Sequence, residues 1–156
     1  MLLIMALDNE AGCALDRADV DRALAAASEA VQVIEPGKIF DRARARALIR
    51  RAECLVAKEE QEKAEEDLKQ AWTFLESKFG IRGPGLVVMY ARWWEVKAKA
   101  HLGRKETAEA KEAITKAIEH RKQIMDMSEG PNPHAAAALL KAQDKLAEIE
   151  GTIRSG

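Results

Sequence analysis

The side chains that most often carry catalysis or bind metal ions are few in this chain and lie far apart. His101, His120 and His134 fall in different expected elements, and no local motif unites them. Cys13 and Cys54 are 41 residues apart, and no Cys-x-x-Cys or Cys/His spacing typical of zinc is present. We expect both thiols to be small buried residues and His101 to pack in the core. The sequence therefore predicts a protein that is not an enzyme, with no catalytic residue, no cofactor and no metal site.

A second set of residues suits binding rather than catalysis. Residues 42–51 contain five arginines, whose planar guanidinium groups match the geometry of carboxylates: Arg42, Arg44, Arg46, Arg50 and Arg51. The whole chain has 25 basic and 26 acidic side chains, a net charge of −1. A wide nucleic-acid-binding surface normally requires a strong basic excess, so no nucleic-acid partner is expected.

The distribution of apolar residues gives no sign of a membrane protein. The start, MLLIMALDNEAG, is apolar over seven residues and then acidic, without the basic start or cleavage site of a secretory signal. No stretch approaches the 18 apolar residues that a spanning helix needs. We therefore expect no membrane segment and a cytoplasmic location with reduced thiols.

The elements that must position these residues are expected to be helices. Ala, Leu, Glu, Lys and Arg, which favour helices, are abundant, whereas the chain has only one Tyr, three Phe and three Trp. The four prolines lie in three Gly/Pro clusters, at residues 35–37, 80–85 and 130–133. Polar midpoints at 58–60 and 103–105 divide the long blocks between clusters into hairpins. The expected helices are 2–15, 19–34, 39–57, 61–79, 86–102, 106–127 and 133–150.

The hairpins repeat one pattern of residue sizes. Shifting the chain by 41 residues, and then by 46, superposes a frame of large, small and medium side chains. The small positions are expected where the two helices of a hairpin cross closely. The frame in the third hairpin is Trp94, Ala98, His101, Ala110, Ile114 and Ala117, and in the second Leu48, Ala52, Leu55, Ala64, Leu68 and Ala71.

This frame resembles the tetratricopeptide repeat, and its length of 41 to 46 residues is similar to the long-repeat, kinesin-light-chain type. The resemblance implies an all-α, right-handed helical-hairpin solenoid that forms a single domain over residues 1–156. Its three repeats would span about 1–35, 38–80 and 84–128. A C-terminal helix at 133–150 would cap the last repeat, because a terminal repeat exposes an apolar face.

The resemblance also implies where a partner would bind. In the family, the first helix of each hairpin lines an inner groove, and the groove positions carry over to Arg46, Arg50, Glu53, Arg92, Glu95 and Lys99. These residues favour a partner with an acidic surface or an acidic peptide. The alternative is a solvated face in which the same charges pair with one another, because Arg46 and Arg50 lie within helical reach of Glu53 or its neighbours.

The function implied is therefore a non-catalytic protein–protein interaction module or adaptor. Small bacterial relatives of the kinesin-light-chain type are associated with tubulin-like filaments, which gives a bacterial filament-binding accessory protein as the narrowest prediction. The alternatives are a chaperone-type or secretion adaptor that binds an acidic peptide, and a small enzyme.

Large apolar residues mark two further places where contacts are expected. Trp93 is predicted either to meet Trp72 across a repeat junction, beside the core residue Trp94, or to be an exposed anchor for a partner. The run Leu2-Leu3-Ile4-Met5 is wider than one hairpin partner can cover. It suggests a homodimer formed through the N-terminal end.

Two segments receive more local predictions. Residues 58–69 form a charge run with i,i+4 pairs of opposite sign, and we expect this helix to be exposed to solvent. The last helix should begin with Asn132 as N-cap and Pro133 as its first residue. It is expected to present one apolar face for capping: Leu139, Leu140, Ala142, Leu146 and Ile149.

Overall fold

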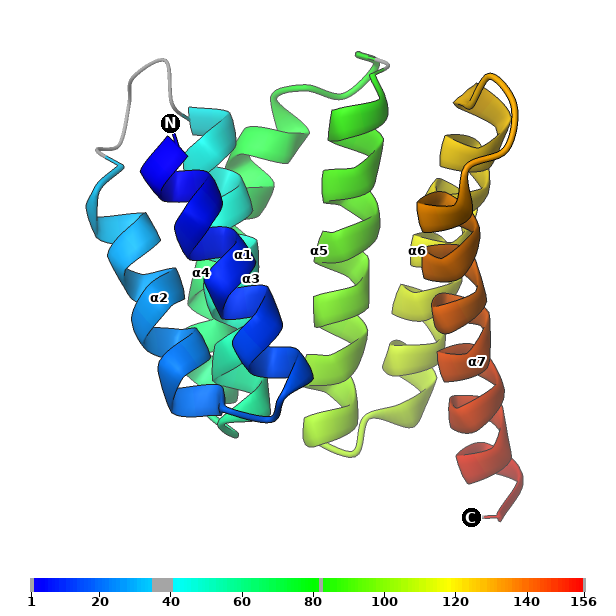
Figure 1. The fold of residues 1–156 in the computed structure, drawn as a ribbon. Coiled ribbons are helices and arrows are strands. Elements are labelled where there is room, and N and C mark those ends of the chain that lie inside the picture. Colours follow the sequence, from blue (N-terminus) through cyan, green and yellow to red (C-terminus); the bar gives the residue numbers. More distant parts are fainter. Residues whose placement is uncertain (1, 35–40, 82, 156) are drawn as a thin grey trace. The chain divides into compact units, whose positions relative to one another are not determined.

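The computed structural model describes residues 2–34, 41–81 and 83–155, and every regular element in them is an α-helix (Figure 1). This confirms the all-α fold class. The chain divides into two compact units, residues 1–78 and 79–156. The continuous solenoid and the single domain stay predictions.

The first unit consists of two antiparallel helical hairpins, drawn from blue to green in Figure 1. The second and third helices also pack against each other, which joins the two hairpins. The helices are α1 (Leu2–Asp16), α2 (Val20–Gln32), α3 (Asp41–Ala57) and α4 (Gln61–Glu76). The expected bounds are confirmed to within three residues, except for the start of the third helix, whose first two expected residues lie outside the described part of the chain.

The second unit consists of one hairpin and a final helix that packs antiparallel on its second helix. The helices are α5 (Pro84–Gly103), α6 (Thr107–Met127) and α7 (Pro133–Ser155). Asn132 caps α7 as expected, since its side-chain oxygen accepts a hydrogen bond of 3.0 Å from the backbone N–H of Ala135. α7 runs five residues beyond the predicted end because no Gly/Pro cluster follows Glu150.

All three hairpins turn in the same way. In each, one residue after the first helix has a left-handed backbone, with φ of 59° at Ala18, 64° at Glu59 and 61° at Lys105. The next residue donates its N–H to a carbonyl five residues earlier. These bonds are Asp19 to Ala14 at 2.8 Å, Glu60 to Leu55 at 2.8 Å and Glu106 to His101 at 2.9 Å. The spacing of the turns equals the 41- and 46-residue shifts found in the sequence.

The small positions of the repeated frame are the most buried places in the hairpins. All nine alanines at these positions are at most 2% exposed: Ala11, Ala23, Ala30, Ala52, Ala64, Ala71, Ala98, Ala110 and Ala117. An alanine at a helix crossing lets two backbones approach closely. The repeat therefore exists in the packing as well as in the sequence.

The prediction that residues 58–69 are entirely exposed is wrong. Asp67 is only 3% exposed, and its carboxylate binds the guanidinium of Arg51 through two contacts of 2.7 Å. Gln61 is also buried. A run of charged residues is fully solvated only when the neighbouring helix offers no opposite charge. Here α3 offers Arg51, which draws Asp67 into the interface.

The predicted apolar face of α7 is correct except at one residue. Ala142 and Ile149 are buried against α6, and Leu139 and Leu146 pack partly buried against the same cluster. Leu140 is 58% exposed because it follows Leu139 by about 100° around the helix.

Candidate binding site

Four of the five arginines of α3 bind groups on or next to three neighbouring helices. Arg44 donates to the backbone carbonyls of Val31 and Ile34, at 3.2 and 2.7 Å, and so satisfies the end of α2. Arg51 binds Asp67 of α4. The other three, spaced four residues apart and therefore on one side of the helix, form what we call the arginine row: Arg42, Arg46 and Arg50.

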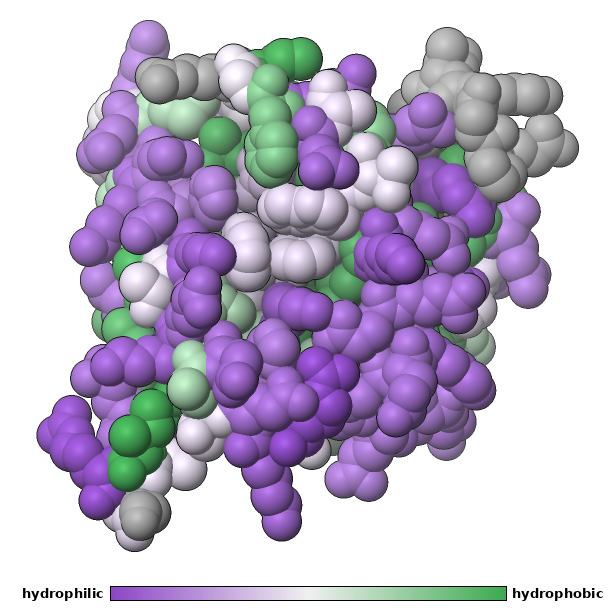
Figure 2. All heavy atoms as spheres, turned by 180° about the vertical axis from the view of Figure 1, so that it is seen from behind, coloured by the Kyte–Doolittle hydropathy of each residue, from purple (hydrophilic) through white to green (hydrophobic). Residues whose placement is uncertain are grey.

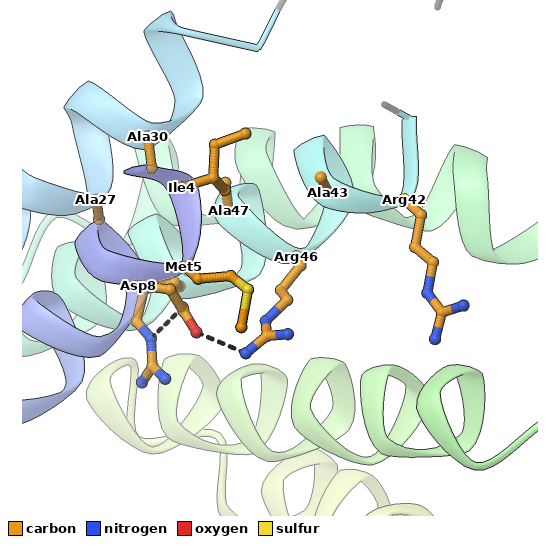
Figure 3. A pocket seen from close by; sticks show the side chains of 10 residues that line it. Ile4, Met5, Asp8, Ala27, Ala30, Arg42, Ala43, Arg46 and Ala47 are labelled. Carbon is orange, nitrogen blue, oxygen red and sulfur yellow. Dashed lines mark hydrogen bonds and ion pairs between the residues drawn. The ribbon is translucent and has the colours of Figure 1, made fainter. Parts of the chain in front are cut away.

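A buried carboxylate of α1 holds two members of the row. Asp8 is 5% exposed. Its Oδ2 accepts a hydrogen bond of 2.9 Å from Nη2 of Arg46, and its Oδ1 accepts one of 3.0 Å from Nε of Arg50 (Figure 3). Because the carboxylate of Asp8 binds two arginines of α3, it fixes α1 to α3.

Arg50 is the most enclosed member of the row. Its Nη1 donates 2.9 Å to Glu53, and its guanidinium lies against Gly12 of α1, whose missing side chain leaves room for it. Burial opposes its charge, but the carboxylates of Glu53 and Asp8 outweigh that effect and raise the pKa of Arg50 above its ordinary value. Arg50 therefore stays charged and holds α1 and α3 together through its carboxylate partners.

The outer end of the row is open to solvent. The side chain of Arg46 is 50% exposed, and only its Nη2 bonds to a described residue. Arg42, one turn nearer the start of α3, is also exposed and has no ion pair with the described residues. These two guanidinium groups can receive carboxylates of another molecule without first losing all their own contacts.

A cavity of about 350 Å³ lies beside the row, within the first unit. α1, α2 and α3 each contribute to its wall (Figure 3). The lining residues are Ile4, Met5, Asp8, Ala27, Ala30, Arg42, Ala43, Arg46, Ala47 and Arg50. The arrangement places an apolar hollow directly next to exposed positive charge.

The predicted binding residues thus fall into two groups. Arg46, Arg50 and Glu53 are brought together on α3, and the pair between Arg50 and Glu53 is one that the self-paired alternative anticipates. Arg92, Glu95 and Lys99 belong to α5 in the second unit. Glu95 is bound there by Arg121 of α6, through contacts of 2.8 and 3.0 Å.

Trp93 is not an exposed anchor. Its side chain is 8% exposed, and its ring meets that of Trp94 edge-on with the centroids 4.8 Å apart. Trp94 packs against the core formed by α6 and α7, and the ammonium group of Lys116 lies 4.4 Å from its ring centroid. The expected contact between Trp72 and Trp93 would join two units and stays a prediction.

Sequence reasoning missed two components of the site. The ion pairs of Asp8 with α3 were not foreseen, although an acidic residue opposite two arginines is a recognisable signal. The cavity was missed because it is formed by four alanines, and short side chains are as common in tight helix crossings as beside hollows.

His101 and the two cysteines are the remaining candidates for chemistry. The Nδ1 atom of His101 lies 2.5 Å from Glu106, which begins the next helix. Burial, with a contribution from Glu53, raises the pKa of Cys54 to about 11, so this thiol is protonated at neutral pH. Cys13 is exposed, contrary to prediction, whereas Cys54 is buried as expected. Within the described residues, no three His, Cys, Asp or Glu side chains are grouped as metal ligands.

Figure 2 shows one face of the molecule. On this face, hydrophilic side chains predominate and hydrophobic ones are visible in small, separate areas. None of the described helices combines the length and the apolar character required to cross a bilayer.

Comparison with known proteins gives no relative from which a function could be transferred. No family model, no curated protein and no solved structure matches this chain. The site must therefore be interpreted from its own chemistry.

Proposed function

We propose that the protein is a non-catalytic protein-binding module, and that its partner presents carboxylates to the arginine row. The observation that carries this proposal is the exposure of Arg42 and Arg46 beside a cavity. Arginine forks bind carboxylates with two parallel hydrogen bonds, which gives both direction and selectivity.

The charges around the row favour an acidic partner. Three arginines stand at i, i+4 and i+8 of one helix, and like charges at this spacing repel each other. Among the described residues, the carboxylates of Asp8 and Glu53 bind the row, at distances of 2.9 to 3.0 Å. The row therefore retains positive charge toward solvent, and an added carboxylate would relieve the repulsion.

The position of Arg42 supports the same conclusion. It lies in the first turn of α3, where the aligned peptide dipoles already give partial positive charge. A cation in this turn costs the helix about 0.3–1 kcal/mol. A carboxylate bound there would interact favourably with both the guanidinium and the helix terminus.

The wider architecture that we propose for this function is the tetratricopeptide-like solenoid. The three identical turns and the nine buried alanines support a repeat of this type. In such a solenoid α1, α3 and α5 would line one groove, which would add Arg92 and Lys99 to the binding surface.

A charge reversal at Arg42 tests the proposal. The probe is a fluorescein-labelled ten-residue peptide of alternating Glu and Ser, followed by anisotropy at low salt. We expect Arg42→Glu to weaken binding about tenfold, a loss of about 1.4 kcal/mol. Lys69→Glu, an equal charge change at an exposed site of α4, is the matched control and should bind like the unchanged protein. Equal weakening in both variants, or no binding by the unchanged protein, would contradict the proposal.

The narrower proposal is that the acidic partner is a bacterial tubulin-like filament. Its test is co-sedimentation with polymerised filaments at low salt. The unchanged protein should pellet and Arg42→Glu should stay in the supernatant. An adaptor for a chaperone or secretion system would instead bind the acidic peptide and fail to pellet.

A further inference from the structure

The cavity beside the arginine row offers more than a surface for acidic groups. A partner that used only charge would need Arg42 and Arg46, yet the hollow between α1, α2 and α3 would then remain unoccupied. Its size, about 350 Å³, falls within the range of sites for small molecules.

The hollow exists because four facing side chains are short. Ala27 and Ala30 lie three apart on α2, and Ala43 and Ala47 lie four apart on α3, so each pair shares one side of its helix. Protein interiors are normally filled to the density of organic crystals. Here Ala27, Ala30 and Ala47 close the inner side of the hollow, since each is at most 4% exposed. The open part lies beside Ile4, Met5 and Ala43, whose side chains are partly or fully exposed.

The charges at the cavity select among possible ligands. A cation would face the exposed guanidinium groups of Arg42 and Arg46 and would be repelled. A neutral molecule would leave their free donors unused. Asp8 also lines the cavity, but its two oxygens already accept hydrogen bonds from Arg46 and Arg50. The complementary ligand is therefore apolar at one end and anionic at the other.

We propose that this cavity binds a small unbranched alkyl carboxylate. The alkyl chain lies against Ile4, Met5 and Ala43, and the carboxylate accepts hydrogen bonds from Arg42 and Arg46. Figure 3 shows the side chains of Arg42 and Arg46 extending from α3 toward the same side, with Met5 and Asp8 beside Arg46. This binding goes beyond the proposed protein partner and does not depend on it.

Calorimetry with butanoate, hexanoate and octanoate tests the apolar half of the proposal. Affinity should rise by up to about fourfold for each added methylene, because each one removes apolar surface from water. Octanol, which lacks the charge, should bind about tenfold more weakly than octanoate, and octylamine should not bind. Equal affinity for octanol and octanoate, or no affinity increase along the series, would overturn the proposal.

Filling the cavity provides the second arm of the test. Ala43 is only partly buried, so Ala43→Leu can place its side chain in the hollow without disturbing the core. We expect it to weaken octanoate binding about tenfold or more, as lost methylene contacts would predict. The control, Ala25→Leu, adds the same side chain at an exposed position of α2 and should leave binding unchanged.

Circular dichroism establishes that both variants are folded. If both weaken octanoate binding equally, the cavity is not the site and the inference is wrong. Octanoate binding without binding of the acidic peptide would leave this inference standing and remove the proposed protein-binding function. Binding of the acidic peptide without binding of octanoate would remove this inference and leave the proposed protein-binding function standing.

Discussion

Two buried carboxylates show how position alone gives similar ion pairs different roles. Asp8 and Asp67 are each less than 6% exposed, and each is held by arginines of α3. The hydrogen bond to Asp67 raises the pKa of Arg51 and outweighs the effect of its burial. That pair closes the second hairpin from within, whereas Asp8 holds the inner end of a row whose outer end meets solvent.

Neutralising Asp67 should therefore be costly. In Asp67→Asn, one oxygen becomes an NH₂ group that faces the guanidinium of Arg51, so a partly buried cation loses its charged partner. We expect the free energy of unfolding to fall by about 2–3 kcal/mol, measured by urea denaturation. Asp16→Asn, at an exposed position near the end of α1, should change it by less than about 0.5 kcal/mol. A similar small change in Asp67→Asn would show that the pair contributes little.

The hairpin turns are the most regular elements of the chain, and they use an unfavourable residue. Helices that end in this way usually have glycine at the left-handed position, because a side chain there meets the backbone. Here the position is held by Ala18, Glu59 and Lys105. In each turn the left-handed residue also donates its N–H to the carbonyl three residues earlier, and these two hydrogen bonds maintain a conformation that the residue would not adopt by preference.

Lys105→Gly should consequently stabilise the second unit. Relief of the left-handed strain exceeds the extra entropy that glycine loses on folding, and we expect a gain of about 0.5–1 kcal/mol in the free energy of unfolding. Introducing glycine inside a helix, as in Ala25→Gly, should instead lower the free energy of unfolding by about 0.5–1 kcal/mol. Denaturation curves of the two variants must shift in opposite directions. A destabilised Lys105→Gly variant would mean that the lysine side chain itself contributes to the turn.

At this scale the sequence was a reliable guide wherever one helix decides the outcome. Proline and glycine clusters mark helix ends because they act on the local backbone. Accordingly, α5 begins at Pro84 and α7 begins at Pro133. Asp67 was misplaced for the opposite reason. Its surroundings depend on which neighbouring helix lies within reach, and the hydrophobicity of a single helix does not contain that information.

At the scale of the whole molecule, the contacts of the candidate site within one helix could be predicted, whereas those between helices could not. Arg46, Arg50 and Glu53 could be foreseen as neighbours because they share α3. Asp8, which binds both arginines, lies on α1, 38 residues from Arg46 and 42 from Arg50 in the sequence, and only the packed hairpins bring them together. The cavity is harder still to foresee, since it is defined by side chains that are absent.

The exposed start of α1 leads to a prediction for the assembly of the molecule. Leu2 and Leu3 are 85% and 55% exposed, and such adjacent leucines are stabilised when a second surface covers them. We expect the chain to form a homodimer through this end. Analytical ultracentrifugation over a range of concentrations should show a reversible dimer that is lost in the double variant Leu2→Ser, Leu3→Ser.

A matched change on another exposed apolar surface separates this contact from general stickiness. Leu140 and Ile153 of α7 are 58% and 43% exposed, so Leu140→Ser with Ile153→Ser removes comparable side chains at the other end of the chain. This control should dimerise like the unchanged protein, because its leucines at positions 2 and 3 remain. If the unchanged protein sediments as a monomer at every concentration, or if the control loses the dimer as well, the N-terminal end is not the interface.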